Sequence, residues 1–486
     1  MAAIITETFR RNSSKLLLSD ISNSANSYYV GIGKSDDWYE DLAVGATAPF
    51  PIGTFGDNQN ALHALTNLIK VSAPSVNTVI PRVFARPGEK YKIYNTYDPS
   101  CLYPSGDINP CYIVLESGIY LCIDKETLNS TFTLPVDFGI GKGYEPFLAD
   151  GYTWVFLGEY DIYHPINTEQ FIKVSTSHVV DTGVLAEIKT ETGGLVYGFH
   201  VLNGGLYTNT VGDNPNIVLT INGSDADIFG FRKENVTIGP LPCTTSQVLI
   251  GSTVYRNLNT ISNLLISQFV SGYKSASVLV DVYENSIVSP PIEPAVVAAM
   301  IAPPLGFAEN PSGVLPAWYI GISINTNAAT PDVYSKYSQR SLIKNPLDED
   351  GELLTQSAIN TLKSFSFITI GGVPYDLSNI EVGFIITQTI DNVTYDIGTI
   401  DSINYETGVI YYIQNVKTGH SPLSSSYAVK FTMPNGSIIN SDPYIINVIN
   451  NSIYAHGTGE CVFLENRSPI TRSEDQNEEL KIIIQL

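Results

Sequence analysis

The run CYIVLESGIYLCID, residues Cys111–Asp124, decides the fold class of this chain. It is filled with Ile, Val, Leu and Tyr, and β-branched and aromatic side chains are enriched in strands. Similar runs recur along the chain, with Gly, Pro and Asn clustered between them as turn signals. They are SYYVGIG, YTWVFLGEY, NIVLTING, SASVLVDVYE, WYIGISI, EVGFIIT, GVIYYIQNV and YAVKFTM. The sequence therefore predicts a mainly β protein: a multi-domain β-sandwich core with a few short helices and inserted β modules.

Composition shifts predict where the domains join. The Pro-Pro pair in VSPPIEPAVV cannot continue a strand ladder, and NPLDEDGELL has the composition of a solvated acidic turn. The predicted parts are an amino-terminal core β domain over 1–187, an inserted β module with a helix over 188–290, a return to the core over 291–347, an inserted β-rich domain over 348–455, and a carboxy-terminal core strand over 456–486.

Three segments have the apolar spacing of an amphipathic helix. In NQNALHALTNLIKV the leucines fall on one face of such a helix, and YRNLNTISNLLISQFVSG and LTQSAINTLKSF have a similar spacing. We therefore expect helices over Asn58–Val71, Tyr255–Gly272 and Leu354–Phe365.

The charge balance excludes two classes of partner. Asp and Glu outnumber Lys and Arg by 48 to 26, which gives a formal net charge of −22. Nucleic-acid binding requires a basic surface that displaces counterions, and anionic membranes also attract basic segments. No run approaches the ~18 apolar residues of a membrane-spanning helix, and the first twenty residues lack the continuous apolar region of a signal peptide. We expect no nucleic-acid and no membrane partner.

The five cysteines are few for the length, and no two have the close spacing of a zinc or redox motif. They are Cys101, Cys111, Cys122, Cys243 and Cys461. We expect free thiols from a reducing compartment. A Cys101–Cys111 bridge is the alternative, because both residues flank a turn region rich in Pro and Gly.

Enzyme signatures are sparse. The six histidines are scattered, without the spacing of a zinc site. The loop GIGKGY, Gly139–Tyr144, lacks Ser or Thr after its lysine, and no predicted helix follows to cradle a phosphate. This pattern favours a tight turn over a nucleotide site.

Acidic clusters carry a similarly weak signal. Asp36, Asp37 and Glu40 flank Trp38 as in a sugar-binding patch, but they equally suit the polar rim of a packed tryptophan. The acidic turn over 348–352 lacks EF-hand spacing. The sequence therefore predicts no catalytic residue, no cofactor and no metal ligand.

The final stretch, ENRSPITRSEDQNEELKIIIQL (residues 465–486), resembles the carboxy terminus of the baseplate wedge subunit, the gene-eight product family, of contractile-tailed bacteriophages (myoviruses). GKSDDW, VIPR, DGYTW and RSLIKNPL are similar to stretches of that family in the same order, although Asp37 and Ser468 stand where the family has proline. The matching residues taken as a structural motif are Trp38, Pro81, Arg82, Asp150, Trp154, Asn345, Pro346, Glu465, Asn466, Arg467, Pro469, Asp475, Gln476, Glu478 and Glu479.

The resemblance implies a structural, non-enzymatic virion protein without cofactors. Members of the family form homodimers in each wedge and contact the wedge subunits of genes six, seven and ten. Such a protein would be assembled in the host bacterial cytoplasm and would reside in the tail baseplate. It would be a rigid connector that helps to transmit the baseplate rearrangement on host attachment, because packed interfaces switch between discrete arrangements.

Two alternatives belong to other functional classes. One is a receptor- or carbohydrate-binding tail protein whose site lies around Gly204, Gly205, Leu206 and Tyr207. The other is a glycan hydrolase that uses dispersed carboxylates.

The terminal stretch also supports expectations about structure. Leu480–Leu486 is rich in apolar residues for a chain end, which favours a central or well-covered strand of the core. Arg467, Asp475, Glu478 and Glu479 are candidates for one hydrogen-bonded network before that strand, and Pro469 is expected to end any strand that precedes it. The alternative is a solvated loop whose charges contribute little.

Overall fold

The computed structural model of the chain describes residues 6–34, 38, 48–85, 89–115, 118–125, 147–149, 151–175, 194–208, 216–225, 236–241, 243–250, 253–264, 272–284, 287–289, 291–325, 336–414, 421–433, 435–449, 453–471 and 478–486. It is mainly β with several separate sheets, which confirms the predicted β-rich, multi-domain fold class. The chain forms two compact units. Unit 1 comprises residues 1–14, 78–320 and 485–486, and unit 2 comprises residues 15–77 and 321–484.

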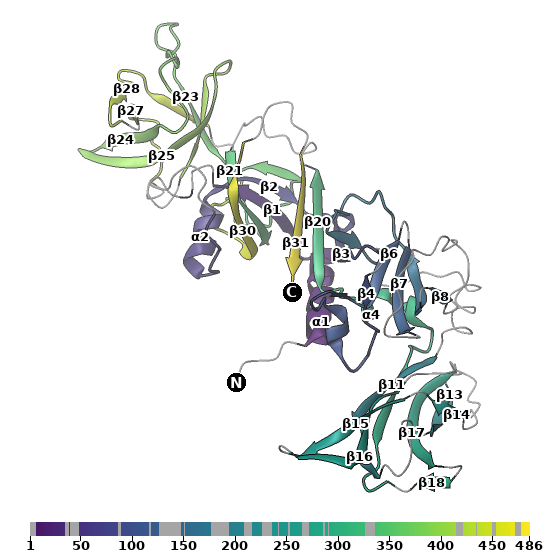
Figure 1. Cartoon of the computed structure of the whole chain (residues 1–486). Helices are drawn as coiled ribbons and strands as arrows, with labels where there is room; N and C mark the ends of the chain where they lie inside the picture. The colour runs from purple at the N-terminus through teal and green to yellow at the C-terminus, as the bar shows by residue number, and fades with distance from the viewer. Residues whose placement is uncertain are drawn as a thin grey trace. The chain divides into compact units, whose positions relative to one another are not determined.

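Unit 1 contains a four-stranded antiparallel sheet in the order β6-β7-β9-β8, three strands of which are labelled in Figure 1. Its strands are β6 (Tyr112–Leu115), β7 (Gly118–Lys125), β9 (Tyr152–Glu159) and β8 (Phe147–Ala149). Along β7, Ile119, Leu121 and Ile123 enter one buried cluster, whereas Tyr120 and Cys122 enter another. Burial on both faces explains why residues 119–123 are continuously apolar.

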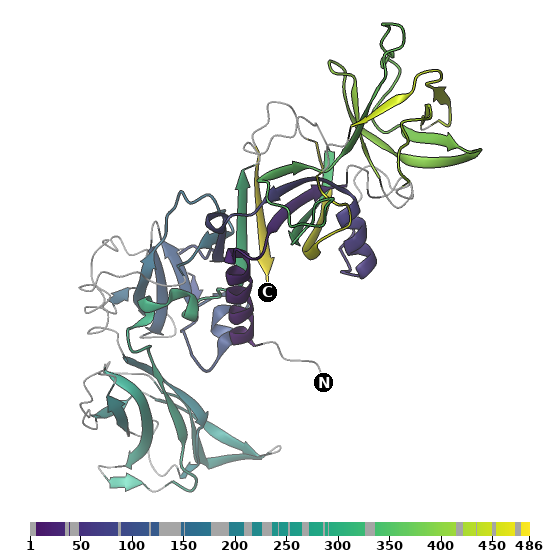
Figure 2. The ribbon, with the colours of Figure 1, turned by 180° about the vertical axis from the view of Figure 1, so that it is seen from behind.

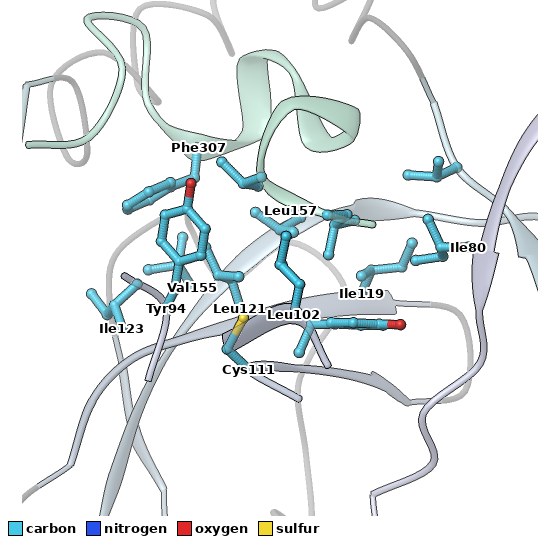
Figure 3. Close-up of a cluster of buried hydrophobic side chains, with 14 of the residues drawn as sticks. Ile80, Tyr94, Leu102, Cys111, Ile119, Leu121, Ile123, Val155, Leu157 and Phe307 are labelled. Carbon is cyan, nitrogen blue, oxygen red and sulfur yellow. The ribbon is translucent and has the colours of Figure 1, made fainter. Parts of the chain in front are cut away.

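The larger cluster also includes side chains outside the sheet. Figure 3 shows residues of β7 and β9 gathered with Tyr94 and Phe307, whose rings meet edge to face at 5.9 Å between centroids. Phe307 begins the 3₁₀ helix η3 (Phe307–Glu309), and Leu102 ends η2 (Pro99–Leu102). Short helical turns thus close one face of this sheet.

Most other strands of unit 1 form small sheets with the orders β4-β5, β11-β19, β12-β16-β15 and β14-β13-β17-β18. Their bounds are β4 Lys90–Tyr91, β5 Ile108–Asn109, β11 Val196–Asn203, β12 Tyr207–Thr208, β13 Asn216–Asp225, β14 Val236–Leu241, β15 Cys243–Ile250, β16 Thr253–Leu264, β17 Tyr273–Glu284, β18 Ile287–Ser289 and β19 Val296–Ile301. The helix α4 spans Pro311–Val314. Strands between 196 and 301 share a small core that includes Phe199, Ile261 and Tyr273.

Unit 2 contains a five-stranded antiparallel sheet in the order β22-β2-β1-β21-β30. The bounds are β22 Ala358–Asn360, β2 Leu65–Lys70, β1 Tyr28–Gly33, β21 Lys336–Lys344 and β30 Glu460–Thr471. Figure 2 shows purple β1, green β21 and yellow β30 side by side, so segments from the start, middle and end of the chain meet in one sheet.

A seven-stranded antiparallel sheet occupies residues 363–449 of unit 2, in the order β28-β27-β24-β25-β26-β23-β29. The bounds are β23 Lys363–Phe367, β24 Ile385–Ile390, β25 Val393–Asn404, β26 Val409–Ile413, β27 Val429–Thr432, β28 Ile438–Asn440 and β29 Ile446–Ile449. Its own apolar core includes Phe365, Ile386, Ile400 and Phe431.

The terminal strand differs from the expectation of a central position. A further sheet has the order β10-β3-β20-β31, made of Phe171–Lys173, Val76–Pro81, Tyr319–Asn325 and Glu479–Gln485. β31 is therefore the last strand of that order, not a central one. Leu480, Ile482 and Ile484 are buried, while Lys481 and Ile483 are half-buried. Alternating burial fits a strand with one well-covered face.

The three predicted helices are wrong over most of their length. The structure has α2 over Phe55–His63, with a Thr54 capping box, followed by β2. Most of the predicted helix over 255–272 is instead part of β16 as far as Leu264, and residues 265–271 lie outside the described part. Residues 354–365 contribute to β22 and β23. Pairing with neighbouring strands outweighs the local helical spacing in each case.

Besides η2, η3 and α4, two further helical segments were not expected. The helix α1 spans Glu7–Ser22, and η1 spans Ala73–Ser75. No helix in the described residues is long and apolar enough to cross a membrane. Cys101, Cys111, Cys122 and Cys461 are free thiols, so the alternative Cys101–Cys111 bridge is absent; the side chain of Cys243 lies outside the described part.

Candidate functional site

Three of the motif stretches converge on β21 and its neighbours in unit 2. Residues 337–343 of β21 are all buried, and the strand pairs with β1 on one side and β30 on the other. The β30 register sets Arg340 opposite Glu465 and Gln339 opposite Asn466. Sheet pairing thus brings residues more than 120 positions apart into direct contact, and we call this group the β21 cluster.

An ion pair lies at the centre of the β21 cluster. Arg340 Nη2 lies 2.5 Å from Glu465 Oε2, and the two side chains are 11% and 37% exposed. A second guanidinium nitrogen, Nη1, donates to the Lys481 carbonyl at 3.4 Å. A charge this deeply buried requires a partner, so Glu465 neutralises a cation that the sheet places in its interior.

The neighbouring motif residues hold loops against β30. Asn466 accepts from Gln339 Nε2 at 2.8 Å and donates through Nδ2 to the Pro49 carbonyl at 2.9 Å. Trp38 Nε1 donates to the Arg467 carbonyl at 2.8 Å, and the Lys34 ammonium lies 4.9 Å from the centroid of its ring. The side chains of Asn466 and Trp38 are therefore engaged inside the protein.

Pro469 does not end a strand, contrary to the expectation. β30 runs from Glu460 to Thr471, and its register with β21 shifts between Tyr337 and Gln339. The irregularity falls at the stretch that contains Arg467 and Pro469. Proline is tolerated in a sheet at a bulge or an edge, and β30 is the last strand of its sheet.

The predicted terminal network is only partly observed. Tyr337 donates to Glu478 Oε1 at 2.5 Å, and burial together with this carboxylate raises the pKa of the phenol. Glu479 instead accepts from Ser323 Oγ at 2.8 Å. Arg467 and Glu478 both act electrostatically on Tyr337, whereas Asp475 and Gln476 lie outside the described residues.

Asn345 and Pro346 form the corner after β21. Asn345 has φ of +52°, a conformation that asparagine tolerates better than most residues. Its Oδ1 accepts from the Ser27 amide at 2.8 Å. Next to it, Lys344 Nζ lies 2.5 Å from Asp20 Oδ2, which also accepts from the Tyr28 hydroxyl. The hydrogen bond from Lys344 is the main cause that lowers the pKa of Asp20.

The other motif residues lie in unit 1. Pro81 ends β3 opposite Phe171, and the Arg82 amide donates to the Gln170 carbonyl at 2.7 Å. Trp154 is fully buried in β9 with its ring 5.5 Å from that of Tyr91. Asp150 lies outside the described residues. The motif therefore does not form one site.

The enzyme-like features do not assemble into a reactive centre in the described part. Asp348 Oδ1 accepts from the Asp350 and Glu352 amides at 3.0 and 2.8 Å, so it organises its own turn. No group of three or more His, Cys, Asp or Glu side chains is suitably placed for a metal among these residues. Gly139–Tyr144 and the acidic residues beside Trp38 lie outside the described part.

The alternative sugar site around Gly204–Tyr207 is packed against another segment. The Leu206 amide donates to the Glu293 carbonyl at 2.8 Å. Gly205 has φ of +65°, and a Cβ there would lie 2.6 Å from the Ala295 nitrogen. The glycine is needed for this close backbone approach, which gives these residues a local structural role.

The sequence reasoning missed Arg340, Gln339 and Tyr337. They lie in the matched stretch or just before it, but their importance depends on partners that only the sheet register brings near. The one available signal was an arginine within a stretch that resembles a family strand, because a buried arginine demands a partner. In comparisons with known proteins, no family model matches the chain and no curated protein matches it significantly.

Proposed function

We propose that the chain is a structural subunit of the baseplate wedge of a contractile-tailed bacteriophage. In this role it is a homodimeric connector without enzymatic activity, located in the virion tail baseplate. It contacts neighbouring wedge subunits, those of genes six, seven and ten by the resemblance, and helps to transmit the rearrangement on host attachment.

The β21 cluster is the observation that carries this proposal. Glu465, Asn466 and Trp38 use their polar groups to bind β21 and the loops beside it. A catalytic or ligand-binding motif would keep such groups available for a substrate. Residues used in this way suit a rigid body that transmits force through its interfaces.

The test has two parts. Light scattering coupled to size-exclusion chromatography is expected to give twice the 53.0 kDa chain mass at micromolar concentration. The chain is also expected to occupy a wedge position in a cryo-EM map of the particle that encodes it. A strict monomer, or a map that places the chain in a fibre, would contradict the proposal.

Activity assays separate the alternatives. Specific binding on a glycan array would favour a receptor-binding protein. Release of sugars from cell-wall or polysaccharide substrates would favour a hydrolase. The proposed function requires both assays to give background signal, with a known lectin and a known lysozyme as positive controls.

A further inference from the structure

A cavity of about 340 Å³ in unit 1 remains unexplained by the proposed connector role. It is lined by residues 81–84 and Glu89, and by residues within 102–112 and 316–319. Its wall combines proline rings, among them Pro104 and Pro316, with the aromatic rings of Tyr103 and Tyr319. Ligand sites typically have this size and an apolar wall with few polar groups.

Arg82 supplies the cationic group of the lining. Its guanidinium lies 4.4 Å from the centroid of the Phe84 ring, and Nη2 makes a long hydrogen bond of 3.4 Å to the Tyr160 hydroxyl. Its Nε is buried without a hydrogen-bond partner, and Arg82 forms no ion pair within the described residues. Arg82 as a whole is half-buried, and a guanidinium without a counter-ion is a preferred partner for a carboxylate.

The carboxylate already in the lining is engaged elsewhere. Glu89 Oε2 accepts from Asn109 Nδ2 at 2.8 Å. In a chain of net charge −22, Arg82 is thus a cation in an apolar wall that lacks an acidic partner from the described protein. Charge complementarity therefore points to an anionic group on the ligand.

We propose that this cavity binds an extended, proline-containing peptide segment with a carboxylate, contributed by a neighbouring subunit. The carboxylate binds the Arg82 guanidinium, and the prolyl ring packs on Tyr103 and Tyr319. Polyproline II segments suit this role because they have no internal hydrogen bonds and dock in aromatic-lined grooves. This inference names a partner chemistry and therefore rests on the proposed connector function.

The test uses fluorescein-labelled Pro-Pro-Glu-Pro peptide and its Pro-Pro-Gln-Pro counterpart, with fluorescence polarisation on the full-length dimer. The Glu peptide is expected to bind saturably, and the Gln peptide about tenfold or more weakly, as for a lost charged hydrogen bond. Arg82→Gln is expected to cause a similar loss for the Glu peptide, with no further loss for the Gln peptide.

Lys90→Gln is the matched control, because Lys90 is an exposed cation of unit 1 paired with Asp107 outside the cavity wall. It is expected to leave binding unchanged. Absence of saturable binding at millimolar peptide, or equal binding by wild type and Arg82→Gln, would overturn the proposal. If Arg82→Gln fails to fold, the Glu and Gln peptides compared on the wild-type protein decide the question.

Light scattering on the same samples separates the two proposals. If the protein is a dimer but does not bind the Glu peptide, only the assignment of the cavity as a peptide site is overturned. A monomer that binds the peptide through Arg82 overturns the dimeric connector and supports the cavity as a peptide site.

Discussion

At the residue scale, Arg340 shows how much of this protein depends on single partners. The guanidinium is nearly buried, and Glu465 is the only acid that the described structure places in an ion pair with it. Removing one member of a buried pair leaves a charge without compensation, which costs more than the pair itself contributes.

Glu465→Gln is expected to lower the free energy of unfolding by about 1–3 kcal/mol, because Arg340 keeps its burial and loses its counter-charge. Urea denaturation monitored by circular dichroism measures the loss. The double variant Arg340→Met/Glu465→Leu is expected to recover most of it. Lys90→Ala, which breaks an exposed pair, is the control and should leave the midpoint in place. If Glu465→Gln leaves the urea midpoint unchanged, the Arg340 guanidinium is hydrogen-bonded to water in place of Glu465.

Asp20 gives a prediction about pH. Lys344 and Tyr28 hold its folded-state pKa below the ordinary value of 3.8. The charged Asp20 side chain therefore stabilises the folded protein fully at pH values above 3.8. This stabilisation is lost as the pH falls through the lower pKa that Asp20 has in the folded state. Asp20→Asn is expected to be less stable than wild type at pH 7, with a smaller difference at pH 3. An equal difference in the free energy of unfolding between wild type and Asp20→Asn at pH 7 and at pH 3 would rule out linkage through Asp20.

At the element scale, β1 is packed so tightly that a methyl group does not fit. A Cβ on Gly31 would lie 2.6 Å from Leu65 Cδ2 and 2.7 Å from Ser341 Oγ. The side chains on both adjacent strands would have to move. The centre of the five-stranded sheet thus depends on a residue without a side chain.

Gly31→Ala is expected to destabilise the protein by about 1–3 kcal/mol through overpacking. Gly56, in the first turn of α2, is the matched control, since the nearest atom to its Cβ position is Thr54 Oγ1 at 3.8 Å. Gly56→Ala should change stability by less than about 1 kcal/mol, in the stabilising direction. Thermal unfolding of both variants tests this contrast, and equal effects would contradict it.

The terminal strand provides the second test at this scale. Deleting residues 480–486 is expected to abolish soluble expression, because β31 buries Leu480, Ile482 and Ile484. The sharper comparison is between neighbours: Ile482→Ala is expected to cost about 2–5 kcal/mol, and Ile483→Ala clearly less. Chemical denaturation measures both. Equal costs would mean that the strand is covered on both faces.

The same elements show why the sequence predicted the strands better than the helices. β7 is recognisable because burial on both faces fills it with β-branched and aromatic residues. Leu62, Leu65 and Leu68 satisfy a helical spacing, yet the helix ends at His63 because Leu65–Lys70 pairs with two strands. Strand pairing is a long-range property that local spacing does not contain.

The candidate site was predictable only in part for a similar reason. Glu465 and Asn466 were identified through the resemblance, whereas Arg340 and Gln339 follow from the β21–β30 register. That register contains an irregularity beside Pro469, and no local pattern predicts how a bulge realigns two strands.

At the scale of the whole molecule, the net charge of −22 acts on the proposed homodimer. Two such chains repel each other at a distance, and the Debye length falls from about 30 Å at 0.01 M salt to about 8 Å at 0.15 M. The dimer is therefore expected to tighten as salt rises over this range. Sedimentation velocity at several protein concentrations measures the dissociation constant. A dissociation constant that rises with salt would instead indicate that ion pairs across the dimer interface dominate.

The strand order of the five-stranded sheet determines when this sheet can form during synthesis of the protein. β1 is complete at Gly33, but β30, which flanks β21 on the far side, is finished only at Thr471. At synthesis rates of about 5–20 residues per second, the first strand is made roughly 20–90 s before the last one emerges. During that interval the apolar residues of the nascent chain have no finished sheet to enter. The nascent chain is therefore expected to bind chaperones that recognise exposed apolar segments before this sheet is complete.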